Sequence, residues 1–94
     1  MTSEQSTATG TGSAASIRDA LMDFLVQRLR TTVAVEQDLF ASGLVNSMFA
    51  MELVVKVEEL FDVEVVGPDL QLVNFRSVEA MTELVLRLRS SGDA

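Results

Sequence analysis

The chain has 94 residues, which suits a single domain, and 48% of them are hydrophobic. It contains no Cys and no His, which excludes disulfides, thiolate metal sites and the commonest general base of enzymes. No stretch reaches the ~18–20 apolar residues of a membrane span, and the N-terminus lacks the pattern of a secretory signal, so a cytoplasmic location is expected.

The net charge of −7 is concentrated in one part of the chain. Residues 36–69 contain eight acidic residues and a single basic one, Lys56, so this third of the chain carries the whole imbalance. Such a surface repels nucleic acid and anionic membranes and attracts basic protein surfaces. We therefore expect no nucleic-acid or membrane partner, and an acidic face that serves protein partners.

The first 15 residues are rich in Ser, Thr, Gly and Ala, and we expect them to form a disordered tail. The first helix is expected to begin at Ser16, because Ser16 and Asp19 have the spacing of a capping box. Apolar residues then recur at helical spacing: Ile17, Leu21, Phe24, Leu25 and Leu29. Residues 33–46 form a long loop with enough apolar side chains to pack onto the core.

A second helix is predicted over residues 47–61, which contain neither Gly nor Pro. Ser47 lies at its start and is expected to cap it. One apolar stripe points to the core and comprises Ala50, Leu53, Val54, Val57 and Phe61. A second apolar line, made of Met48, Met51 and Val55, lies on a different face and predicts a docking surface, since charged residues show that the helix is not buried all round.

The remaining segments predict a short helix and a last long one. Residues 61–65 alternate like a strand but have no partner strand, so we interpret them as an extended connection. Residues 69–75 fit a short helix capped by Asp69, and Ser77 can cap a last helix. Its apolar stripe is Val78, Met81, Leu84, Val85 and Leu88. The prediction is an all-α domain over residues 16–90, a bundle of three main helices and one short helix, with residues 91–94 disordered.

Residues 38–48, DLFASGLVNSM, resemble the attachment-site motif of acyl and peptidyl carrier proteins, which reads roughly D-x-F/L-x-x-x-G-x-D-S-L/M. The resemblance continues through residues 51–54 and 57–65, resumes at residues 69–70 and 74–78, and covers about residues 17–88 in all. It implies the carrier-protein four-helix bundle, in which Ser47 receives 4′-phosphopantetheine from coenzyme A through a separate phosphopantetheinyl transferase. The thiol of this arm would hold an acyl or aminoacyl group as a thioester. A helix N-terminus suits the new phosphodiester.

The same resemblance assigns a surface of the second helix to partner enzymes: Met48, Met51, Glu52, Val55, Glu58 and Glu59. Phe49 departs from the family, many members of which have a small or polar residue at this position. Phe49 either reaches the edge of the core or is an exposed contact, and we favour the exposed contact. Asn46 stands where the family usually has Asp, which removes a charge where the transferase and its magnesium ion act. The implied partners are this transferase, a loading enzyme, and an acyltransferase, ketosynthase or condensation enzyme. The protein itself is expected to be a monomer without catalytic or metal-binding residues, and not an enzyme.

Residues 44–53, LVNSMFAMEL, are more similar to free-standing carriers of polyketide and nonribosomal peptide (antibiotic) pathways than to fatty-acid carriers. They are most similar to carriers of a small polar unit, such as a glyceryl or hydroxymalonyl extender, or of an amino acid. We expect a loaded arm that stays largely in solvent. The alternatives are a fatty-acid carrier, a module of a larger synthase and an unmodified helical adaptor, which Asn46 favours. A carboxylate enzyme is disfavoured because no paired carboxylates form a catalytic motif.

Overall fold

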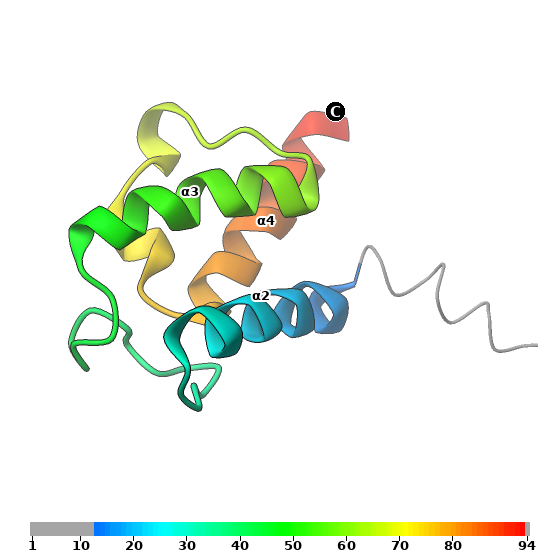
Figure 1. Ribbon diagram of the computed structural model, residues 1–94. Helices are drawn as coiled ribbons and strands as arrows, with labels where there is room; N and C mark the ends of the chain where they lie inside the picture. Colours follow the sequence, from blue (N-terminus) through cyan, green and yellow to red (C-terminus); the bar gives the residue numbers. More distant parts are fainter. Residues whose placement is uncertain (1–12, 94) are drawn as a thin grey trace, which may run out of the picture.

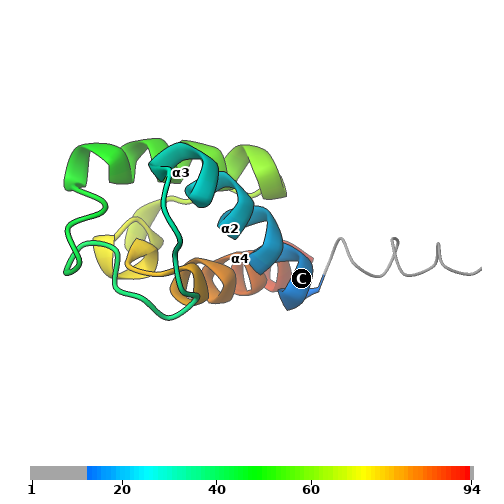
Figure 2. The same ribbon diagram turned by 60° about the horizontal axis from the view of Figure 1, so that its bottom comes forward.

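The computed structural model describes residues 13–93, which form α-helices and short 3₁₀ turns without any strand. The elements are α2 (Ala14–Leu29), α3 (Ser47–Phe61), η1 (Gly67–Asp69), η2 (Leu72–Phe75) and α4 (Val78–Asp93). Figure 1 shows α4 between α3 and α2, whereas in the turned view of Figure 2 α2 lies between α3 and α4, so each of the three long helices packs against the other two. The all-α prediction is confirmed at the level of a small helical bundle. Within the described residues, no helix is both long and apolar enough to cross a membrane.

The first helix begins two residues earlier than predicted. Ser13, and not Ser16, is its N-cap: the Ser13 hydroxyl accepts a hydrogen bond from the Ser16 backbone N–H at 3.1 Å. The predicted capping box at Ser16 is therefore wrong, and residues 13–15 belong to the folded part. The two alanines between the serines are strong helix formers and extend the helix to the earlier cap. The rest of the predicted tail, residues 1–12, lies outside the described residues.

Two helices end on residues with left-handed backbone conformations. Arg30 caps α2 with φ of 60°, and its N–H donates to the carbonyl of Val26 at 2.8 Å. Asp62 caps α3 with φ of 56° in the same way. The last helix continues to Asp93, three residues beyond the predicted end of the domain at residue 90.

The core combines the three helices with the long loop between α2 and α3. The loop supplies Val33, Leu39 and Val45, all buried, which confirms that it packs onto the core. Each such apolar side chain contributes roughly 1.5–3 kcal/mol when fully buried. The other members come from the helices and from the segment between α3 and α4, which supplies Val65 and Phe75. The helices supply Ile17, Leu21, Leu25, Leu53, Val57, Phe61, Val78, Met81, Leu84 and Val85.

Backbone hydrogen bonds tie the long loop to the segment that precedes α4. The Leu39 N–H donates to the carbonyl of Arg76 at 2.6 Å, and the Glu79 N–H donates to the carbonyl of Val35 at 3.0 Å. Ser77 caps α4 as predicted, since its hydroxyl accepts from the Ala80 N–H at 3.0 Å. The loop that leads to α3 is thus bonded at Val35, near its start, and at Leu39, near its middle, to the backbone around the start of α4.

The segment between α3 and α4 corrects the prediction of one short helix over residues 69–75. Residues 63–66 are extended, as expected, and two separate 3₁₀ turns follow. Asp69 ends the first turn, and Gln71 occupies the N-cap position of the second without a capping hydrogen bond; its side-chain amide donates instead to the carbonyl of Pro68 at 2.8 Å. Phe75 at the end of η2 is buried and anchors the segment to the core.

Candidate functional site

Ser47 is the first residue of α3 and is exposed to solvent. Ser47 was predicted both to cap the helix and to be the attachment site. The prediction of the cap is wrong, because Asn46 is the N-cap. The Asn46 side-chain oxygen accepts a hydrogen bond from the Phe49 N–H at 2.9 Å. Within residues 13–93 the Ser47 hydroxyl has no hydrogen-bond partner. The hydroxyl is therefore exposed at a helix N-terminus and is not required to hold the helix together.

The chain that leads to Ser47 is well ordered by its own hydrogen bonds. Asp38 accepts from the backbone N–H groups of Phe40 and Ala41, at 3.0 and 2.9 Å, and so closes a turn. Gly43 follows with φ of 82°, a conformation that favours glycine. Val45 is buried, and its N–H donates to the carbonyl of Leu39 at 3.1 Å. These contacts fix the backbone two residues before Ser47, so the hydroxyl is presented from a defined position.

The second apolar line of α3 is exposed, as predicted. The exposed fractions are 82% for Met48, 62% for Met51 and 51% for Val55. The core-facing stripe is also confirmed: Leu53 and Val57 are fully buried, although Val54 is only half-buried. An exposed apolar line on a helix with a complete core-facing stripe is typical of an interaction surface.

Glu52 does not present a free carboxylate, because Arg28 of α2 pairs with it. The Arg28 Nε and Nη2 atoms each lie 2.9 Å from one carboxylate oxygen of Glu52. The hydrogen bond from Arg28 holds the pKa of the Glu52 carboxyl below its usual value, and the charges of Arg28 and Lys56 act in the same direction. The same bond raises the pKa of Arg28. Glu52 was predicted to contact partners, and the structure adds a second role as a link between α2 and α3.

Phe49 lies within the same cluster and is half-buried, so the structure favours the core-edge alternative over the exposed contact that we predicted. Its ring stacks on that of Phe24, with centroids 6.3 Å apart and planes 13° from parallel. The Arg28 guanidinium lies 5.1 Å from the Phe49 centroid, and the Lys56 ammonium lies 5.2 Å from the Phe24 centroid. Cations at these distances from aromatic faces are attracted to them. This side of α3 is thus covered by α2.

The two acidic residues near the end of α3 differ in their surroundings. The Glu58 carboxylate is half-buried and accepts a hydrogen bond from the Val65 N–H at 2.9 Å, which holds the extended connection against α3. Glu59 is exposed, and its contact with Lys56 is long, at 3.9 Å. Of the two, Glu59 is the one whose charge is available to another molecule.

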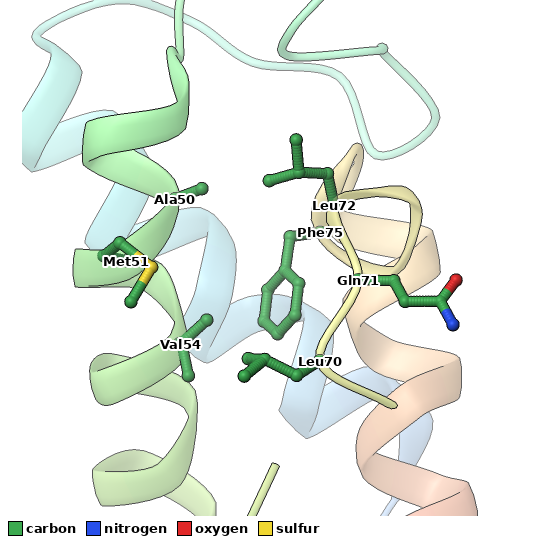
Figure 3. Close-up of a pocket in the computed structure, with 7 residues that line it drawn as sticks. All are labelled: Ala50, Met51, Val54, Leu70, Gln71, Leu72 and Phe75. Atoms are coloured by element: carbon green, nitrogen blue, oxygen red, sulfur yellow. The ribbon is translucent and has the colours of Figure 1, made fainter. Parts of the chain in front are cut away.

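An apolar pocket of about 100 Å³ lies between α3 and the η2 segment, and sequence reasoning did not find it. Figure 3 shows Ala50, Met51 and Val54 of α3 on one side of the gap and Leu70, Leu72 and Phe75 on the other, with the Gln71 side chain pointing away from it. The lining residues are Ala50, Met51, Val54, Leu70, Gln71, Leu72 and Phe75. Leu70 and Leu72 remain about half exposed, at 49% and 53%. Among the described residues, no cluster of three acidic side chains is arranged to hold a metal ion.

Comparisons with protein-family models, with curated proteins and with solved structures find no match to this chain.

Proposed function

We propose that this protein is a carrier that bears an acyl or aminoacyl group as a thioester on a 4′-phosphopantetheine arm attached to Ser47. The observation that supports this proposal most is the exposed, unpartnered Ser47 hydroxyl at the start of α3. The ordered loop before it and the exposed apolar line beside it are the features that an enzyme acting on Ser47 would need for recognition. The motif resemblance of residues 38–48 supplies the chemical identity of the arm.

The attachment reaction requires a base that this chain does not place beside Ser47. In the proposed step the Ser47 oxygen bonds to the pantetheine-side phosphorus of coenzyme A, and the pyrophosphate P–O bond breaks. Adenosine 3′,5′-bisphosphate leaves, and the serine proton passes to a base on the transferase. The substitution of Asn46 for the family's Asp leaves the helix cap intact, since Asn and Asp cap equally well. It changes only the charge beside Ser47.

The pocket limits the cargo that the carrier could shelter. Its volume of about 100 Å³ is smaller than the roughly 150 Å³ apolar cavity that holds a benzene molecule. Phe75, which lines the pocket, is buried, and so is Leu53 of α3, so the packed core leaves little room for a longer chain. A short or polar cargo that stays largely in solvent fits this geometry better than a growing fatty chain. We therefore propose a cargo of the small polar extender or amino-acid kind, in a polyketide or nonribosomal peptide pathway.

The attachment is tested by incubating the protein with coenzyme A and a broad-specificity transferase, followed by intact-mass measurement. The expected result is the gain of one phosphopantetheine, lost in Ser47→Ala. Ser42→Ala is a matched control, because Ser42 is also exposed and lies in the same loop. If loading survived Ser47→Ala but was lost in Ser42→Ala, Ser42 would be the attachment site and the assignment of Ser47 would be wrong. If the wild type were not loaded at all, an unmodified helical adaptor would be favoured.

The cargo is tested by loading short polar, aminoacyl and medium-chain acyl groups and comparing backbone amide chemical shifts. A solvent-exposed cargo should produce small shifts confined to residues around Ser47 and the pocket mouth. Large shifts at core residues such as Val57 and Leu84, growing with chain length, would indicate a sequestered fatty chain and contradict the proposal.

A further inference from the structure

The first turn of α3, which carries Ser47, has little buried surface of its own. Ser47 and Met48 are exposed, and between the buried residues Val45 and Leu53 only Ala50 is buried. The Ala50 side chain is a single methyl group, so its burial contributes less than that of the larger core residues farther along the helix. A further contact is therefore needed to fix how this turn lies on the molecule.

Phe49 provides that contact, because it joins the N-cap of α3 to α2. Its backbone N–H donates to the Asn46 side chain at 2.9 Å, and its ring stacks on that of Phe24 with centroids 6.3 Å apart. The Arg28 guanidinium lies 5.1 Å from the Phe49 centroid. The same guanidinium donates two hydrogen bonds of 2.9 Å to Glu52. We call these four side chains the α2–α3 clamp: Phe24, Arg28, Phe49 and Glu52.

The α2–α3 clamp determines where the Ser47 hydroxyl points. Ser47 lies between Asn46 and Phe49, the two residues that the capping hydrogen bond joins. At about 100° of rotation per residue, Ser47 stands roughly 200° around the helix from Phe49. While Phe49 is held against α2, Ser47 therefore faces away from α2, and any rotation or fraying of the first turn would move both residues together.

We infer that the α2–α3 clamp positions Ser47 for the attachment of phosphopantetheine, and that Phe24 is a positioning residue for this reaction although it lies on another helix. The inference rests on the proposed function. The hydroxyl has to meet the pantetheine-side phosphorus in line, and a displacement of about 1 Å can slow such a step about 100-fold. Loss of the clamp should therefore lower the rate of the step within the complex more than the affinity for the transferase.

The test is single-turnover loading with coenzyme A at increasing concentrations of a broad-specificity transferase in excess. Phe24→Ala removes the stacked ring and leaves the sequence of α3 unchanged. We expect a maximal loading rate about tenfold below that of the wild type, and a half-saturating transferase concentration within about twofold. Phe24→Tyr keeps the ring and should restore the rate. Hydrogen exchange at the Phe49 and Ala50 amides, which both donate to Asn46, should be about tenfold faster in Phe24→Ala.

Phe61→Ala is the matched control, because Phe61 is also an aromatic residue of α3 with an Arg side chain near its ring. The Arg89 guanidinium lies 5.8 Å from the Phe61 centroid, and Phe61 is more deeply buried than Phe24. Phe61 lies at the other end of α3, about 20 Å from Ser47 along the helix axis. Its loss should lower stability but leave the loading rate and the amide exchange of the first turn unchanged.

Far-UV circular dichroism checks that each variant is folded. If Phe24→Ala does not fold, Arg28→Gln/Glu52→Gln carries the test, because both side chains are exposed and the net charge is kept. This double variant should lower the maximal rate about threefold or more.

A wild-type maximal rate or unchanged amide exchange in the folded clamp variant would overturn the inference. So would an equal loss of loading in Phe61→Ala, because the effect would then follow from stability alone. If the wild type were not loaded at Ser47, the proposed function would be refuted and this inference with it.

Discussion

Separate residues for the helix cap and the candidate attachment site allow stability and modification to be changed independently. Asn46→Ala removes the oxygen that accepts the Phe49 N–H at 2.9 Å. Loss of such a cap costs about 1 kcal/mol, within a range of roughly 0.5–2 kcal/mol. For a domain of this size, 1 kcal/mol lowers the melting temperature by about 4–8 °C. Asn46→Ala should therefore be measurably less stable, yet should still be loaded, because Ser47 is unchanged.

Ser47→Ala should show the opposite behaviour. Ser47 is the first helical residue and makes no capping bond, and Ala is a better helix former than Ser. We expect its unfolding free energy to stay within about 0.5 kcal/mol of the wild type, while loading is abolished. Thermal and urea unfolding followed by circular dichroism give the stabilities, and intact mass gives the loading. If Ser47→Ala lost about 1 kcal/mol and Asn46→Ala lost nothing, the assignment of the cap would be wrong.

Four further predictions use the same assays. Asn46→Asp should keep the cap and be loaded at least as fast as the wild type; slower loading would mean that Asn46 matches a dedicated transferase. Glu52→Gln should destabilise the fold at neutral pH, because the lowered pKa of Glu52 means that its ionised form stabilises the folded state. The difference in unfolding free energy should shrink once the pH falls below the ordinary carboxyl pKa and Glu52 becomes protonated, and a difference independent of pH would contradict this. Glu59→Lys should slow transferase association and flatten its salt dependence, and unchanged salt dependence would exclude Glu59 from recognition. Leu53→Ala should cost about 2–5 kcal/mol in urea unfolding, and a cost below about 1 kcal/mol would contradict its full burial.

The sequence was most informative where a pattern is local. The bounds of α3 and its two apolar lines follow from spacing within 15 residues and were predicted correctly, except that Val54 of the core-facing stripe is only half-buried. The start of α2 was predicted incorrectly because Ser13 and Ser16 are both good caps, and the choice between them depends on the alanines in between. The prediction of Ser47 as cap failed for the same reason: Asn46 and Ser47 are both capping residues, one position apart.

Contacts between distant parts of the chain could not be predicted. Arg28 and Glu52 are 24 residues apart, and no local pattern indicates that they form an ion pair. The position of Phe49 at the core edge depends on Phe24 of another helix. The pocket depends on how residues 70–75 approach α3, and that approach is set by the burial of Phe75. A cluster of exposed Leu residues after Gly67-Pro68 was the one available signal for it.

Arg30 and Asp62, the two left-handed residues that end α2 and α3, are positions where a substitution could increase the stability of the fold. For most residues a left-handed backbone costs roughly 1–2 kcal/mol, and Asp at position 62 is more tolerant of it than Arg at position 30. Glycine, the usual occupant of such a position, is absent from both. Because small domains are only marginally stable, position 30 is where laboratory evolution for heat resistance would be expected to act early.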